Sequence, residues 1–217
     1  MEIKRKITPY NFIEMDSKIN TYIVIHYVGG ESTAKNNADY FFSNRLSASA
    51  HYFVDENEIW QSVEDFNKAW HCGGGAVGTH HPYLNICTNS NSIGIEMCVK
   101  LRNGEWYFEP ETVENTIKLT KQLMKKYNIP VENVIRHFDV TGKICPVPYV
   151  DESVWKEFKK RLMEIKELTS ANDIVWELAS RGIVTDKEGM LEEISKNPDG
   201  RLYWLARKAV HYIRQRD

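Results

Sequence analysis

The stretch Tyr22-Ile23-Val24-Ile25-His26 is an apolar run that ends on a histidine. A short run rich in β-branched residues predicts a buried strand, and we expect His26 to leave that strand at the edge of the sheet. A similar run, Val134-Ile135-Arg136, ends on His137, and Cys145 follows after an expected loop over 138–144. Two imidazoles and one thiolate leave the fourth position of a tetrahedral zinc ion open for water, which is the catalytic zinc pattern. The sequence therefore predicts a zinc hydrolase with the ligands His26, His137 and Cys145.

Length and composition limit the classes of protein to consider. A chain of 217 residues has room for one full domain and a small appendage. Its formal net charge of -2 gives no basis for nucleic-acid binding. No run of about 18 apolar residues predicts a membrane span, and the basic residues 1–9 are not followed by the apolar stretch of a signal peptide. We therefore expect synthesis in the cytoplasm and no integral membrane segment.

Strand and helix patterns alternate up to residue 168, and we expect residues 1–168 to form one domain. Apolar runs and two-residue alternation predict strands, whereas apolar positions three and four apart predict helices. The expected elements are a strand at 20–27, a helix at 34–46, a hairpin over 50–55 and 58–63, a strand at 92–100, and helices at 110–128 and 151–168.

The pattern changes after residue 168, and we expect 169–217 to form a small three-helix module. Its helices are predicted at 171–181, 186–196 and 199–216, with breaks at Gly182 and at 197–200. The expected core residues of this module are Trp176, Leu178, Ile183, Leu191, Ile194, Trp204, Leu205, Val210 and Ile213.

Two charged residues are candidates for catalysis beside the metal. Glu96 lies in the otherwise apolar run Ser92-Ile93-Gly94-Ile95-Glu96-Met97-Cys98-Val99, where burial would raise its pKa into the range of a general base. Lys143 precedes Cys145 by two positions, so in an extended loop its ammonium would project the same way as the thiolate. A salt-bridged core glutamate and a solvated loop lysine are the competing interpretations.

Candidate substrate-binding residues surround a Gly-rich loop over 72–91. Trp70 and His71 lie at the mouth of this loop, where the indole ring of Trp70 would stack on a sugar ring or, alternatively, pack under the loop. His51 is a further candidate for the site, whereas His80 and His81 are expected to be solvated loop residues.

Five segments, in order along residues 20 to 150, together resemble the type-2 N-acetylmuramoyl-L-alanine amidases, a family that includes phage lysins and peptidoglycan recognition proteins. They are Tyr22-Ile23-Val24-Ile25-His26, Ser49-Ala50-His51-Tyr52-Phe53-Val54-Asp55, Ala69-Trp70-His71-Cys72-Gly73, Asn91-Ser92-Ile93-Gly94-Ile95-Glu96, and Arg136-His137-Phe138-Asp139-Val140 with Lys143-Ile144-Cys145-Pro146.

The resemblance implies an α/β fold with a mixed central β-sheet flanked by helices, and a zinc ion in an open groove. It implies cleavage of the amide between N-acetylmuramic acid and L-alanine, with Glu96 as the catalytic carboxylate and Lys143 as the cationic helper. The family's third ligand is Cys or Asp, and Cys145 occupies that position here. Several relatives carry a tyrosine beside the zinc where this chain has His51, so we expect His51 to line the site.

Within this family we expect a (pro)phage endolysin that acts on peptidoglycan after release. A cytoplasmic amidase that recycles muramyl peptides and a non-catalytic peptidoglycan-recognition module are the alternatives. A cysteine hydrolase, with Cys145 as nucleophile and His137 as base, is a further hypothesis.

Residues 171–178 resemble helical modules that follow some Gram-positive prophage amidases, so the C-terminal module either binds cell wall or stabilises the protein. We expect a monomer, since no helix shows a sustained heptad seam.

Overall fold

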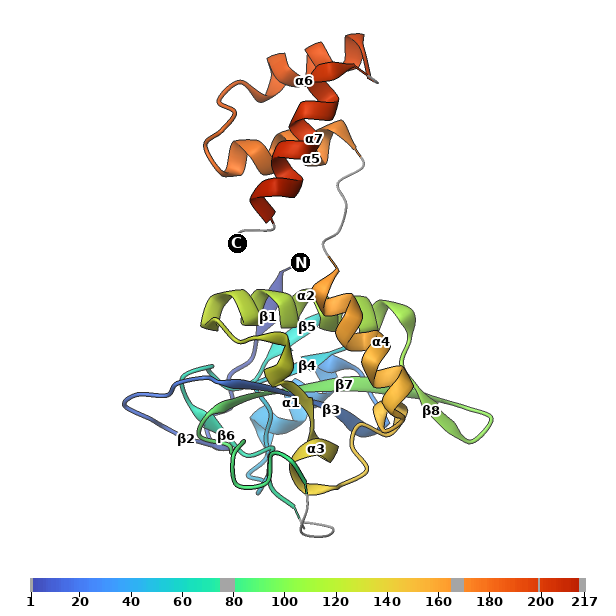
Figure 1. Cartoon of the computed structure of the whole chain (residues 1–217). Coiled ribbons are helices and arrows are strands. Elements are labelled where there is room, and N and C mark those ends of the chain that lie inside the picture. Colours follow the sequence, from blue (N-terminus) through green and yellow to red (C-terminus); the bar gives the residue numbers. More distant parts are fainter. Residues whose placement is uncertain (1, 75–80, 165–169, 199, 215–217) are drawn as a thin grey trace. The chain divides into compact units, whose positions relative to one another are not determined.

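The computed structural model describes residues 2–74, 81–164, 170–198 and 200–214. The chain divides into two compact units, residues 1–163 and 164–217 (Figure 1). The predicted boundary after residue 168 falls among residues 165–169, which lie outside the described part of the chain. No helix in the described part is long and apolar enough to cross a membrane.

A mixed β-sheet forms the centre of the first unit, as expected from the resemblance. Its strand order is β1-β5-β4-β7-β3-β9, and β8 pairs with β7. The pairs β3–β7, β3–β9 and β4–β7 are parallel, whereas β4–β5 and β7–β8 are antiparallel. The strands are β1 (Ile3–Arg5), β3 (Tyr22–Glu31), β4 (Tyr52–Val54), β5 (Ile59–Gln61), β7 (Ser92–Arg102), β8 (Glu105–Tyr107) and β9 (Val134–Arg136); β2 (Phe12–Ile13) and β6 (Lys68–Ala69) pair separately.

Helices cover both faces of this sheet (Figure 1). One face packs against α2 (Pro110–Tyr127) and α4 (Glu152–Met163), and the other against α1 (Ala34–Ser43) and α3 (His137–Thr141). Because side chains alternate along a strand, Ile23 and Ile25 belong to the core under α2 and α4, whereas Val24 and His26 belong to the opposite face. The apolar alternation of β3 thus directs His26 toward the side of the sheet that carries α1 and α3.

The predicted loop over 138–144 is wrong, because its first part is the short helix α3. The Asp139 carboxylate accepts a hydrogen bond from the backbone N–H of Arg136 at 2.8 Å, which caps the start of α3. Gly142, with a φ of 75°, ends the helix in a left-handed conformation that glycine adopts without strain. His137 is therefore the first residue of a helix.

The second unit consists of α5 (Ala171–Ser180), α6 (Lys187–Lys196) and α7 (Arg201–Arg214), the three helices that the sequence predicts. Leu178, Ile194 and Val210 are buried as expected. Four other predicted core residues are exposed, namely Trp176, Ile183, Trp204 and Leu205. In α7 the inward face is formed by Tyr203, Ala206, Val210 and Ile213. α7 has more apolar residues than it buries, since Leu202, Trp204, Leu205 and Tyr212 are exposed, so spacing alone did not identify the buried face.

Asp139→Ala should lower the free energy of unfolding by about 3 kcal/mol, because Asp139 is the main partner of the buried Arg136 guanidinium. Arg136 is 4% exposed, and its Nη2 lies 2.7 Å from Asp139 Oδ1. Glu152→Ala is the matched control, since Glu152 contacts the same Nη2 at 2.9 Å but its side chain is 59% exposed. We expect Glu152→Ala to cost less than about 1 kcal/mol. Denaturant unfolding of both variants measures the difference, and equal losses would contradict this account of α3.

Candidate metal centre

Sheet pairing brings His26 and His137 together. Ile25 of β3 pairs in parallel with Arg136 of β9. His26 follows Ile25 and His137 follows Arg136, so the two histidines lie next to each other. Their ring centroids lie 4.8 Å apart, and each side chain is 2% exposed. The expected strand at 20–27 is too short, since β3 continues to Glu31, and His26 therefore lies within the strand. The partner strand β9 ends at this level, at Arg136.

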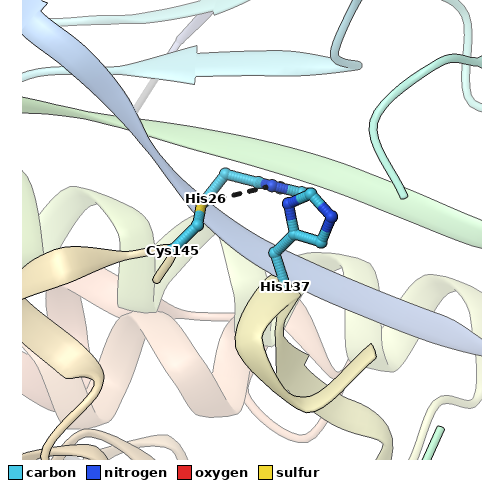
Figure 2. Close-up of side chains that lie close together, drawn as sticks. All are labelled: His26, His137 and Cys145. Carbon is cyan, nitrogen blue, oxygen red and sulfur yellow. Dashed lines mark hydrogen bonds between the residues drawn. The ribbon is translucent and has the colours of Figure 1, made fainter. Parts of the chain in front are cut away.

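Cys145 completes the cluster from the loop after α3 (Figure 2). Its carbonyl oxygen accepts a hydrogen bond from the backbone N–H of Phe138 at 2.8 Å, which ties this loop to the first turn of α3. Its Sγ lies 3.7 Å from Nδ1 of His26. One ligand atom each from His26, His137 and Cys145 lies within 4.8 Å of the other two. The structure thus brings all three predicted ligands to one point.

The state of these side chains fits a zinc ion. Both ring nitrogens of His137 are buried and have no hydrogen-bond partner among the described residues, an arrangement that costs free energy unless a ligand compensates. Burial lowers the pKa of His137 to about 4 and that of His26 well below its usual value, so both imidazoles are neutral and offer a lone pair. Burial also raises the pKa of the Cys145 thiol to about 12, and a bound cation would favour the thiolate. Two neutral imidazoles and a thiolate are a donor set typical of zinc.

Glu96 lies directly beside His26, because β7 pairs with β3 in the register His26–Glu96. The Glu96 side chain is half-buried, and its Oε2 is covered without a hydrogen-bond partner among the described residues. Burial raises the pKa of Glu96 to about 8, and the positive charge of Lys143 acts in the opposite direction. This placement does not match the competing interpretation of a salt-bridged core glutamate.

A groove of about 600 Å³ contains the cluster. Lys143 is exposed and lines this groove together with Glu96 and the three candidate ligands. Half-buried Trp70 also lines it, and its contact with substrate stays a prediction. The groove is therefore open to a ligand on the same side as the metal cluster.

The other two candidate substrate-binding residues lie deeper than Trp70. His71 lines the groove but is only 7% exposed, and its Nδ1 lies 3.1 Å from Nε2 of His26. His51 has no exposed surface. Its Nδ1 accepts a hydrogen bond from the backbone N–H of Gly94 at 3.0 Å, and its Nε2 lies 2.9 Å from Nζ of Lys18. His51 therefore has no surface facing the groove, and its expected role in substrate binding stays a prediction. His81 is half-buried, and His80 lies outside the described residues.

Sequence reasoning missed two residues that support this site. Asn89 accepts hydrogen bonds on Oδ1 from the backbone N–H groups of His71 and Cys72, at 2.9 and 2.7 Å. Gly94 lies under the His71 ring, where an added Cβ would lie 2.6 Å from Cγ of His71. A glycine inside an apolar strand is a signal of such a close approach. Asn89, in a polar loop, offered no comparable signal.

Known proteins share both the sequence and the fold of the first unit. Residues 16–148 match the family model described as N-acetylmuramoyl-L-alanine amidase. The chain is 35% identical over 147 residues to N-acetylmuramoyl-L-alanine amidase CwlL of Bacillus licheniformis, covering 64% of this chain and 40% of that protein. It is 32% identical over 148 residues to N-acetylmuramoyl-L-alanine amidase CwlA of Bacillus subtilis, covering 68% of this chain and 51% of that protein.

A solved structure, that of a mutant endolysin from Bacillus subtilis, matches with a TM-score of 0.60 and 28% identity, over 75% of this chain and 99% of that one. The chain thus spans about half or less of the length of the two curated relatives, but nearly all of this solved structure. Since the family model covers more than half of the 217 residues, the chain belongs to the N-acetylmuramoyl-L-alanine amidase family, which confirms the resemblance found in its motifs.

Proposed function

We propose that this protein is a zinc-dependent amidase that hydrolyses the bond between N-acetylmuramic acid and L-alanine in peptidoglycan. The observation that carries the proposal is the pairing of Glu96 with His26 across β7 and β3, in the same groove as His137, Cys145 and Lys143. This groove combines a zinc donor set, a carboxylate with an unpaired oxygen and a cation. Metal-assisted amide hydrolysis uses these three kinds of group.

Each residue has a distinct role in this reaction. A zinc ion held by His26, His137 and Cys145 would polarise the scissile carbonyl and lower the pKa of water. The Glu96 carboxylate, whose ionised form Lys143 and a bound zinc ion would favour, takes a proton from the attacking water and then passes it to the departing nitrogen of L-alanine. The Lys143 ammonium stabilises the negative charge that develops on the carbonyl oxygen. Trp70 offers an aromatic face within the groove on which a sugar ring can stack.

The cysteine-hydrolase reading has less support. Its nucleophile would be a Cys145 thiolate with His137 as base, but burial raises the pKa of the Cys145 thiol to about 12. The thiol is 3% exposed, and its contact is with Nδ1 of His26. A thiol that is neutral and contacts His26 is a poor match to a nucleophile with His137 as its base, because the thiolate is the reactive form.

For the biological setting we propose an endolysin that acts on the cell wall after release from the cytoplasm. The endolysin among the similar structures supports this setting over the recycling of soluble muramyl peptides.

We further propose that the second unit binds cell wall. Trp176 and Trp204 are 57% and 56% exposed, so much of each indole side chain is available for contact with a ligand. Exposed aromatic rings are suited to stacking on the sugar chain of peptidoglycan.

Glu96→Gln should lower the rate of muramyl-peptide cleavage by roughly a thousandfold, because the amide cannot accept the proton of water. The variant has nearly the same shape, so zinc content and unfolding midpoint should stay at wild-type values. Release of L-alanine termini from purified peptidoglycan measures the rate. Glu114→Gln is the control, since Glu114 lies on the exposed side of α2 and should have full activity. Near-native activity of Glu96→Gln would refute the assigned role.

Removal of divalent metal with a chelator should abolish cleavage, and addition of one equivalent of zinc should restore it, since the catalytic water depends on the metal. Cys145→Ser should bind zinc more weakly, because a hydroxyl is a poorer ligand than a thiolate. Elemental analysis of the purified protein and activity before and after chelation provide the measurement. Full activity in chelator would instead support the cysteine-hydrolase reading.

Trp204→Ala and Trp176→Ala should each weaken binding of the whole chain to purified cell walls by about tenfold, equivalent to ~1.4 kcal/mol. The background for both is Glu96→Gln, so that the walls are not digested during the measurement. Phe66→Ala is the matched control, because Phe66 is a 58% exposed aromatic residue of the first unit. Co-sedimentation with walls gives the bound fraction. Unchanged binding in both tryptophan variants would leave the second unit without a role in wall binding.

A further inference from the structure

A continuous line of hydrogen-bonding groups leads from the metal cluster into the protein, through His26, His71, Ser92 and the carbonyl of Thr88. We propose that His71 is a positioning residue, which holds His26 in the tautomer whose Nδ1 is free to bind the metal. The proposal rests on the function proposed above, because it supposes that His26 is a zinc ligand. It gives His71 a role different from the substrate contact expected from the sequence.

The two nitrogens of His26 point to different neighbours. Nδ1 lies 3.7 Å from Sγ of Cys145, on the side of the candidate ligands. Nε2 lies 3.1 Å from Nδ1 of His71. A neutral imidazole has one N–H and one lone pair, so a metal bound at Nδ1 requires the proton on Nε2. That proton then needs an acceptor, and Nδ1 of His71 is within reach.

The far end of the line determines the direction of every hydrogen bond. The backbone carbonyl of Thr88 can only accept, so the Ser92 hydroxyl, with Oγ 2.5 Å from this oxygen, donates its proton there. Ser92 Oγ is then an acceptor for Nε2–H of His71, at 3.3 Å. Since His71 is thereby protonated on Nε2, its Nδ1 carries the lone pair that accepts from His26. The Cys72 thiol, with Sγ 3.4 Å from the same Nδ1, also lies 3.3 Å from Ser92 Oγ, and donation to that oxygen leaves the single lone pair of His71 Nδ1 for His26.

The His71 ring is also fixed in place by its surroundings. The ring lies against Gly94, where a Cβ would come within 2.6 Å of it. The backbone N–H of His71 donates to Oδ1 of Asn89 at 2.9 Å. His26 and His51 meet the ring edge-on, with centroids 5.1 and 5.5 Å away. These contacts leave little freedom for the ring to turn away from His26.

A fixed tautomer increases the affinity of a histidine for a metal ion. A histidine that populates the wrong tautomer must exchange its proton before it can bind the metal at the correct nitrogen. Partners that orient a metal-binding histidine typically contribute about 10- to 100-fold in metal affinity. His71 would provide this contribution from outside the ligand set.

The test compares His71→Phe with His71→Asn. Phenylalanine retains the ring but has no acceptor, whereas the asparagine Oδ1 can stand near the position of the lost Nδ1. We expect His71→Phe to bind zinc about 10- to 100-fold more weakly in competition with a chelator, and His71→Asn to recover most of the affinity. In metal-free protein, long-range ¹H–¹⁵N spectra should show wild-type His26 protonated on Nε2 alone, and both tautomers in His71→Phe.

A second variant keeps the proposal testable if His71→Phe does not fold. Ser92→Ala retains the His71 ring but removes the acceptor that orients it, so mixed tautomers of His26 are again expected. His211→Phe, in α7 of the second unit, is the control for loss of a histidine and should bind zinc like the wild type. Wild-type His26 protonated on Nδ1, or equal zinc affinity in His71→Phe and wild type, would overturn the proposal. Neither readout uses peptidoglycan, so a protein that behaves as expected here but cleaves no substrate would fail only the proposed amidase function.

Discussion

The parallel pairing of β3 with β7 is the constraint on which the site depends. It sets His26 opposite Glu96, and the pairing of β3 with β9 brings His137 to the same level. Because side chains alternate from face to face, a slip of one residue would move Glu96 to the side of α2 and α4. Such a slip is opposed by the fully buried residues Ile23, Ile25, Ile93 and Ile95, which would have to leave their core. The hydrophobic packing on one face therefore maintains the chemistry on the other.

Burial also controls the charges of the site. It keeps both imidazoles neutral, favours the thiol form of Cys145 and raises the pKa of Glu96 to about 8. A cluster in this state carries little charge of its own, which limits the cost of burying so many polar groups. The same neutrality leaves lone pairs unused, most clearly on His137. These features together suit a site that is completed by a cation.

Support for the ligands extends well beyond the residues that would bind the metal. Arg136, between β9 and α3, joins the Asp139 carboxylate to the carbonyl of Tyr149 and so holds the segment that carries His137. Gly94 leaves the space that the His71 ring fills. Neither residue touches the groove through a catalytic group, but each determines where a ligand side chain lies. Residues such as Arg136 and Gly94 explain why the site depends on the fold of the first unit and not only on the residues that would bind the metal.

The sequence by itself determined the longer strands and helices and indicated the candidate site residues, since short-range apolar patterns and residue chemistry are local properties. The run that ends on His26, the isolated Glu96 and the spacing from His137 to Cys145 were sufficient to indicate a metal site. Only the tertiary structure decided which groups meet: the helical start at His137, the burial of His51, the contact of His71 with His26, and the outward position of Trp204. These depend on strand register and on which helix face finds a partner, and both follow from contacts between residues far apart in the chain, which local patterns do not specify.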